Sequence, residues 1–246
     1  MVITSQDNAK VVEVSKLLDK KYRKATGRYV IEGERLVRDA LKHGANVTDV
    51  FVKLGTEDKF DFENQIVVSE KVFAKMSDTV TSQGVLAVVQ KPDKQPVAPI
   101  GNCLVLDGLQ DPGNVGTLIR TAAASGFTDI YAVNCVDVFS PKVLRSAMSA
   151  HFCVNIWQTD DIRLVFDLLQ HVQKVAADMH GESVFRASFA ERVAIVLGNE
   201  GNGLSEFSKT HVDKTVCLPM QNNFESLNVA VAGSVIMYKI YEYTQK

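Results

Sequence analysis

The sequence is poor in cysteine, and the cysteines it has are widely scattered. Its 246 residues include four cysteines and five histidines, with no CxxC pair and no HxxxH-type cluster. Disulfide frameworks and structural zinc sites need such spacings, so the sequence predicts neither a disulfide nor a metal site. Each cysteine is interpreted as a small apolar core residue. They are Cys103, Cys135, Cys153 and Cys217.

Long apolar runs are also missing, and so is any large excess of charge. No run approaches the roughly 20 residues that cross a bilayer, and residues 1–20 lack the apolar stretch of a signal peptide, so we expect a cytosolic protein. The formal net charge is −2, and 46% of the residues are hydrophobic. Such a composition excludes a disordered or collagen-like chain and permits a substantial core.

A proline-rich segment divides the chain. Residues 91–99 read KPDKQPVAP and have no apolar periodicity, which is typical of a linker. We therefore predict a small α/β domain over residues 1–90, a linker over 91–101 and a second α/β domain over 102–246. Strand-like runs of the first domain are Tyr29–Ile31, Val47–Val52, Ile66–Val68 and Val85–Val89.

The second domain alternates short apolar strands with helical patterns. Helices are predicted after Asn114, Pro141, Asp161 and Ser226. Fully apolar strands separated by helices indicate a mostly parallel sheet with both faces covered, and ligands gather at the carboxyl ends of such strands. The predicted strands are Leu104–Leu106, Ile130–Val133, Val154–Trp157, Val175–Ala177, Val193–Leu197 and Thr215–Leu218.

Basic residues concentrate in the first domain. Between residues 16 and 28 they are opposed by a single acidic residue, Asp19. Two interpretations stay open: a solvated helix face, or a patch that contacts phosphates. The candidate phosphate-contacting residues, which would bind RNA if the partner is a nucleic acid, are Lys20, Lys21, Arg23, Lys24 and Arg28.

Two of the loops at strand ends contain glycine together with polar or charged residues that could act in binding or catalysis. In the first, DGLQDPGN, Pro112 and Gly113 predict a tight turn and Asn114 a helix N-cap, with Arg120 in the second turn. An ordinary surface arginine is the alternative there. The second, LGNEGNG, matches neither the dinucleotide fingerprint nor the P-loop. Glu200 within it would repel a pyrophosphate, which favours a nucleoside that bears a positive charge.

The third loop, LPMQNNFESLN, leads into the last helix. Ser226 or Asn228 can cap that helix. The apolar surface beyond is wider than one stripe, so this helix lies either in a core or in a subunit interface.

Together the three loops resemble the SpoU/TrmH family (SPOUT superfamily) of S-adenosylmethionine-dependent RNA 2′-O-ribose methyltransferases. The segments DPGNVGTLIRTAAASGF, IVLGNEGNGLS and LPMQNNFESLNVAVA stand where that family carries its three motifs, in the same order. SPKVLRSAMSAHF is also similar to a family segment. YVIEGERLVRDAL is similar to the opening of the substrate-binding domain often fused before the catalytic one.

The resemblance implies a catalytic domain with a trefoil knot that works as a homodimer. It implies S-adenosylmethionine as cofactor, held by main-chain groups of Gly198, Leu218 and Leu227 with Leu197 and Met220 beside them. Arg120 would act on the ribose, as a base or by binding the neighbouring phosphate. Because a guanidinium is a poor base, we favour positioning and alkoxide stabilisation. Four further motif residues would orient Arg120 and the methionine part of the cofactor: Asn114, Glu200, Ser226 and Asn228.

Ribosomal RNA is the expected substrate, by analogy with the two-domain members of the family. The alternatives are a tRNA 2′-O-methyltransferase, a catalytically weak RNA-binding or ribosome assembly factor, and a nucleotide-dependent oxidoreductase, which lacks its fingerprint here. One position departs from the family pattern: Asn222 stands where a glycine is common. Asparagine tolerates positive φ better than most residues, so we expect the loop to be kept.

Overall fold

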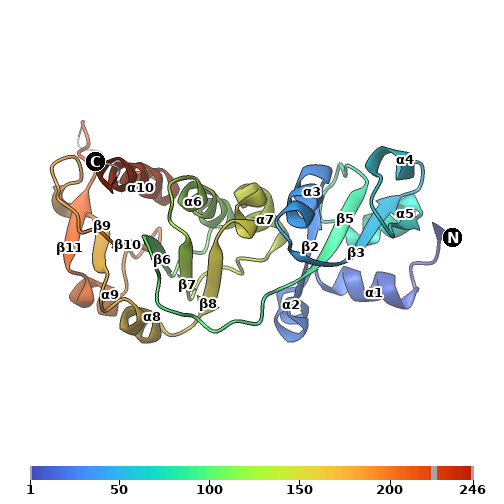
Figure 1. Cartoon of the computed structure of the whole chain (residues 1–246), viewed down its shortest axis with the longest axis horizontal. Coiled ribbons are helices and arrows are strands. Elements are labelled where there is room, and N and C mark those ends of the chain that lie inside the picture. The colour runs from blue at the N-terminus through green and yellow to red at the C-terminus, as the bar shows by residue number, and fades with distance from the viewer. Residues whose placement is uncertain (1, 223–225, 245–246) are drawn as a thin grey trace. The chain divides into compact units, whose positions relative to one another are not determined.

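The computed structural model describes residues 2–222 and 226–244 (Figure 1). The chain divides into two compact units. The first comprises Met1–Lys94 and Phe139–Arg145, and the second comprises Gln95–Val138 and Ser146–Lys246. Within the described ranges, no helix is both long and apolar enough to cross a membrane.

The first unit is built on a mixed sheet with strand order β1-β4-β3-β5-β2. β1 and β3 run parallel to β4, whereas β5 is antiparallel to β2 and β3. The strands are β1 (Val2–Ile3), β2 (Arg28–Glu32), β3 (Asn46–Lys53), β4 (Ile66–Val68) and β5 (Val85–Gln90). The four longer ones coincide with the predicted strands, while β1 is too short to leave a pattern in the sequence.

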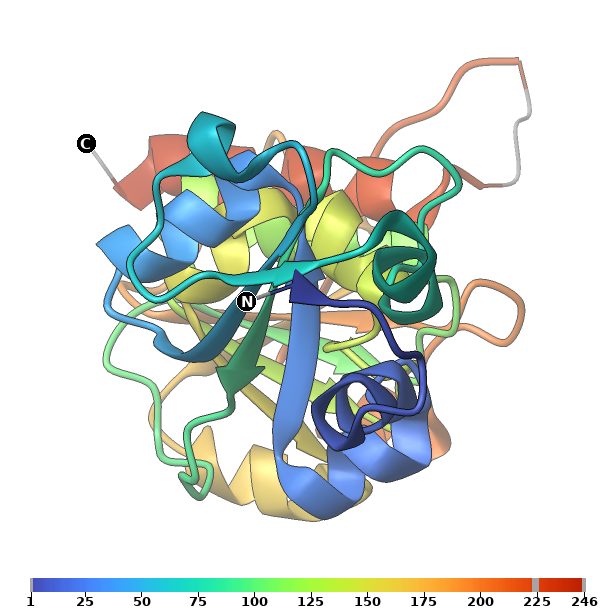
Figure 2. The same cartoon turned by 90° about the vertical axis from the view of Figure 1, so that its right-hand side faces the viewer.

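Helices cover both faces of this sheet. One face packs on α1 and α5, whose apolar residues share a core with Phe51, Leu86 and Val88. Alternate residues of β5 point to the opposite face, where α3 packs (Figure 2). The helices are α1 (Ala9–Lys16), α2 (Lys20–Thr26), α3 (Glu34–Lys42), α4 (Glu57–Phe60) and α5 (Glu70–Met76).

The second unit has a parallel sheet with strand order β11-β9-β10-β6-β7-β8. The predicted α/β class with a mostly parallel sheet is confirmed. Its strands are β6 (Cys103–Asp107), β7 (Asp129–Val133), β8 (Asn155–Thr159), β9 (Gln173–Ser183), β10 (Val193–Gly198) and β11 (Lys214–Cys217). Because all run the same way, their carboxyl ends meet at one edge, and β6 and β10 lie side by side in the middle.

Helices sandwich this sheet too. α6 and α10 lie on one face, and α8 and α9 lie on the other (Figure 1). Apolar residues of α8 form a core with β6, β7 and β10. The helical elements of this unit are α6 (Pro112–Ala124), the 3-10 helix η1 (Met148–Phe152), α8 (Ile162–Leu168), α9 (Glu206–His211) and α10 (Val229–Thr244). Most of α7 (Pro141–Ala147) belongs to the first unit.

One predicted helix start is wrong. α6 begins at Pro112, and the Asp111 side chain caps it by accepting a hydrogen bond from the Asn114 main-chain N–H at 2.8 Å. Proline fits the first helical position because it has no N–H to satisfy there. The pair Pro112 and Gly113 is therefore a first helical turn rather than a tight turn, and the Asn114 side chain is available for other contacts.

Candidate active site

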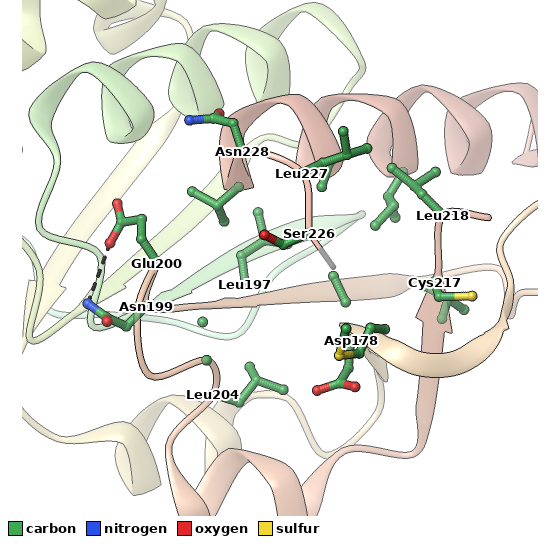
Figure 3. A pocket seen from close by; sticks show the side chains of 18 of the residues that line it. Asp178, Leu197, Asn199, Glu200, Leu204, Cys217, Leu218, Ser226, Leu227 and Asn228 are labelled. Atoms are coloured by element: carbon green, nitrogen blue, oxygen red, sulfur yellow. Dashed lines mark hydrogen bonds between the residues drawn. The ribbon is translucent and has the colours of Figure 1, made fainter. Parts of the chain in front are cut away.

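A cavity of about 360 Å³ opens at the carboxyl ends of β10 and β11 and beside the middle of β9 (Figure 3). Its volume is in the range of small-molecule sites. All the residues predicted to bind the cofactor line it, as do three of the predicted catalytic residues. These eight residues are Leu197, Gly198, Leu218, Met220 and Leu227, with Glu200, Ser226 and Asn228.

Gly198 allows a close backbone approach at the floor of this cavity. A Cβ at this position would lie well inside van der Waals distance of the Gly203 carbonyl carbon and the Leu204 nitrogen. The turn beyond Gly198 closes by two main-chain hydrogen bonds between Asn199 and Gly203, of 2.8 and 2.9 Å. Any side chain at 198 would force that turn apart, so glycine is required for packing here.

Hydrogen bonds through Asn114 connect the three loops. The Asn114 amide donates from Nδ2 to Glu200 Oε1 at 3.1 Å, and its Oδ1 accepts from Asn228 Nδ2 at 2.9 Å. An amide is needed at this position, because it donates to one neighbour and accepts from the other. Residues far apart in sequence are thereby held at the edge where the strands end.

The Glu200 carboxylate also fixes the first loop. Its two oxygens accept hydrogen bonds from the main-chain N–H groups of Gln110 at 3.4 Å and Asp111 at 3.3 Å. Partial desolvation acts to raise the pKa of Glu200, but hydrogen bonds from its own main chain, from Asn114 and from those two N–H groups outweigh it and bring the pKa below its ordinary value. Glu200 is therefore ionised at neutral pH and is a weak base.

Asn228 has a second role, at the start of the last helix. Its Oδ1 accepts hydrogen bonds from the main-chain N–H groups of Ala230 at 2.9 Å and Val231 at 3.2 Å. Of the two predicted caps of α10, Asn228 therefore forms these hydrogen bonds. Asn222, in the preceding loop, has φ +58°, a conformation that asparagine adopts more readily than most residues. Residues 223–225 of the third motif lie outside the described residues.

Arg120 lies apart from this cavity. Its side chain is exposed on α6, and it neither lines the cavity nor forms a hydrogen bond or ion pair with any residue that the structure describes. Asn114 likewise stays outside the lining and reaches it through Glu200 and Asn228. The guanidinium is thus available to a group that comes from outside this chain's own cavity.

The predicted RNA-binding residues differ in how exposed their side chains are. Lys20, Lys21 and Lys24 are exposed on α2 or at its start. Arg23 is only 4% exposed, and its Nη1 donates to the Leu17 carbonyl at 2.7 Å, so this guanidinium holds α1 and α2 together and is not displayed to RNA. Arg28 is partly buried and forms an ion pair with Glu13.

Sequence reasoning missed the contribution of β9. Ala177, Asp178 and Met179 line the cavity where pairing between β9 and β10 ends, after Ala176. The signal was available, since Asp178 directly follows a predicted apolar strand and ligands gather at strand ends. Among the described residues that line the cavity, two are acidic, Asp178 and Glu200, and none is lysine, arginine or histidine.

Comparisons with known proteins agree with this geometry. Residues 101–238 match the SpoU rRNA Methylase family, and residues 8–87 match the MRM3-like substrate binding domain. The chain is 35% identical over 244 residues to the 23S rRNA (guanosine(2553)-2'-O)-methyltransferase RlmP of Bacillus subtilis, covering 97% of this chain and 98% of that protein.

Solved structures show the same similarity. The AdoMet-bound rRNA methyltransferase of Sinorhizobium meliloti superposes with a TM-score of 0.88 at 25% identity, covering 99% of this chain and 98% of that one. The SpoU methyltransferase AviRb of Streptomyces viridochromogenes, in complex with AdoMet, gives 0.85 at 26% identity, covering 96% and 98%. The chain belongs to the SpoU rRNA methylase family and carries an MRM3-like substrate-binding domain before the methylase domain.

Proposed function

We propose that this protein transfers a methyl group from S-adenosylmethionine to a ribose 2′-hydroxyl of ribosomal RNA. The ribosomal substrate is supported by relatives that match nearly the whole chain and are named as 23S rRNA 2′-O-methyltransferases. The cofactor is supported by two neighbours whose structures contain AdoMet. One relative that matches 96% of the chain is named for tRNA or rRNA, whereas a solved structure named for transfer RNA alone covers 58% of it.

The charge of the cavity is the observation that carries this proposal. Two carboxylates and no basic side chain occur among its described lining residues. A pyrophosphate-bearing cofactor would meet repulsion there, whereas a sulfonium cation would be attracted. The cavity therefore fits S-adenosylmethionine and argues against a nicotinamide-dependent oxidoreductase.

When bound, S-adenosylmethionine supplies an electrophilic methyl group. Main-chain groups at Gly198, Leu218 and Leu227 would hold its adenosine part. Glu200 would keep the first and second loops in register, since it accepts three hydrogen bonds from the first loop, donated by Gln110, Asp111 and Asn114. Its charge also favours a cation nearby.

Arg120 is proposed to act on the RNA. A guanidinium is a very poor base, so Arg120 is not suited to take the hydroxyl proton. It can bind the phosphate beside the reacting ribose and stabilise negative charge as it develops on the ribose oxygen. Its exposure and the absence of an ion-pair partner among the described residues fit an external, anionic target.

The first unit is proposed to recruit the RNA through Lys20, Lys21 and Lys24. These side chains are exposed and lie on one short helix or at its start. Phosphate neutralisation by lysines gives sequence-independent attraction, which suits a domain that delivers RNA to another site.

A ribosomal substrate also places the enzyme where ribosomes are assembled, which we take to be the cytoplasm.

A homodimer through α10 belongs to the same proposal. Val231, Val235 and Tyr238 are 51%, 37% and 49% exposed and follow i, i+4, i+7 spacing, which places them on one face of the helix. Such a stripe of large apolar side chains favours burial against a second copy.

A trefoil knot is also proposed. It is supported by the path of the chain, which crosses to the edge strand β11 and then returns to pack α10 on α6 and β10.

Transfer of labelled methyl groups tests the proposal. Unmodified ribosomal RNA and unmodified transfer RNA are incubated separately with the protein and labelled S-adenosylmethionine, and the RNA is digested to nucleosides. We expect label on a 2′-O-methylnucleoside from ribosomal RNA. Label in transfer RNA alone would support the tRNA alternative. RNA binding without any transfer would support an assembly factor.

A further inference from the structure

Asp178 is a carboxylate that the motifs of the family resemblance leave unexplained. It lies in β9 just beyond the last residue paired with β10, lines the cavity, and is half-buried. One oxygen, Oδ1, accepts a hydrogen bond from the His180 main-chain N–H at 2.9 Å. That bond fixes the carboxylate in a local turn at the cavity wall.

No described residue donates a hydrogen bond to the second oxygen of Asp178. Within residues 2–222 and 226–244, Asp178 forms no ion pair, and its Oδ2 accepts no hydrogen bond. Lys209 of α9 attracts the Asp178 charge from beyond ion-pair distance. Partial burial without a donor on Oδ2 still costs free energy because the ion loses hydration. A ligand with hydroxyl or N–H donors would recover that cost.

The position of Asp178 in the cavity indicates which hydrogen-bond donors of the cofactor it can reach. Figure 3 shows Asp178 and Asn228 on opposite sides of the view, with Leu197 and Ser226 between them. Glu200 and Asn228 belong to the side that Asn114 joins to the first loop, where the methyl group must meet the RNA. The sulfonium therefore belongs on that side, and Asp178 faces the adenosine end.

The adenosine end carries two adjacent hydroxyl groups on its ribose. A carboxylate only accepts hydrogen bonds, so at this end it matches the ribose hydroxyls and the adenine amino group, and not the acceptor ring nitrogens. The two hydroxyls are adjacent, so one carboxylate can accept from both. We propose that Asp178 binds the ribose hydroxyls of S-adenosylmethionine and thereby selects a ribonucleoside cofactor. This inference rests on the proposed function, because it assigns a specificity-determining residue to the same cavity.

Calorimetric titration of the full chain tests it with four probes. They are S-adenosylmethionine, S-adenosylhomocysteine, and the 2′-deoxy and 3′-deoxy forms of S-adenosylhomocysteine. In the wild type, we expect loss of the contacted hydroxyl to weaken binding about tenfold, as for a hydrogen bond to a charged group. Asp178→Ala should bind S-adenosylhomocysteine about tenfold more weakly and no longer distinguish the deoxy forms.

Two further variants complete the design. Asp178→Asn keeps the size of the side chain and one acceptor oxygen, so it should fold normally and recover part of the discrimination. Glu182→Gln removes a carboxylate of the same strand that pairs with Lys214 outside the cavity, and it should leave all four affinities unchanged. Thermal unfolding of each variant checks that the fold is intact.

Three results would overturn the assignment. The first is equal affinity of the wild type for S-adenosylhomocysteine and both deoxy forms. The second is unchanged discrimination in both Asp178 variants. The third is a selective loss of S-adenosylmethionine over S-adenosylhomocysteine in Asp178→Ala, which would make Asp178 the partner of the sulfonium charge. A wild type that binds none of the probes would overturn the proposed function as well.

Discussion

Replacing Glu200 by glutamine should loosen the junction between the first two loops. Glu200 Oε1 accepts from Asp111 N and Asn114 Nδ2, and Oε2 accepts from Gln110 N and Asn199 Nδ2. A glutamine has one oxygen and one NH2 group in the same space. Whichever way the amide turns, its nitrogen faces two donors, so two of the four hydrogen bonds are lost.

The expected cost follows from that count. Hydrogen bonds to charged groups contribute about 1.5–3 kcal/mol when buried, and we take about 1 kcal/mol each for a carboxylate that is largely solvated. Glu200→Gln should therefore lower the free energy of unfolding of the second unit by about 2 kcal/mol. Trp157, the single tryptophan, lies in the core of that unit. Its fluorescence during guanidinium denaturation reports the change.

The lowered pKa of Glu200 determines how the stability difference between wild type and Glu200→Gln changes with pH. Because the folded pKa of Glu200 is lowered from 4.5, its stabilisation is present above that pH and is lost as the pH falls through the lowered value. The difference between wild type and Glu200→Gln should thus be largest near pH 7 and shrink below pH 4.5. The control, Glu206→Gln, removes a surface carboxylate paired with Lys209 and should change little. Equal stability of Glu200→Gln and wild type at pH 7, or a difference independent of pH, would refute the reasoning.

Three other substitutions test separate parts of the account. Gly198→Ala should destabilise the second unit by about 1–3 kcal/mol through overpacking and abolish calorimetric binding of S-adenosylmethionine; normal binding would contradict the role of the close turn. Replacing Lys20, Lys21 and Lys24 with alanine should weaken RNA binding and flatten its dependence on log salt by about 0.7–0.9 per lost phosphate contact, and an unchanged slope would make them ordinary solvated surface. Val235→Glu should convert the proposed dimer to a monomer in sedimentation, whereas a dimer of unchanged affinity would place the interface elsewhere.

The sequence predicted the strands of both units better than the beginnings of the helices. Buried strands such as β6 and β10 are continuous apolar runs, which leave a direct pattern. The start of α6 was misplaced because Pro112 and Gly113 are typical of both a turn and a first helical turn. Only the contact of Asp111 with the Asn114 N–H distinguishes them, and short elements such as α4 and α9 have too few residues to show a period.

The roles of several side chains depend on three-dimensional contacts, which the local sequence pattern does not show. Arg23 was grouped with its basic neighbours, but it reaches the Leu17 carbonyl and is buried. The bonds from Asn114 to Glu200 and Asn228 join residues 86 and 114 positions apart. Their motifs were found by resemblance, whereas their geometry required the fold. Asp178 was overlooked because it stands in no motif.

Single-turnover methyl transfer to ribosomal RNA by wild type and Arg120→Ala tests the central claim most directly. Arg163→Ala, on an exposed arginine of α8 that stacks on Phe207, serves as the matched control. The account predicts 2′-O-methylation by wild type and Arg163→Ala, and a loss of about 100-fold or more in Arg120→Ala, as for removal of a transition-state charge contact. It also predicts unchanged calorimetric affinity of Arg120→Ala for S-adenosylmethionine. Undiminished transfer by Arg120→Ala would contradict the account, and so would methylation at a base atom.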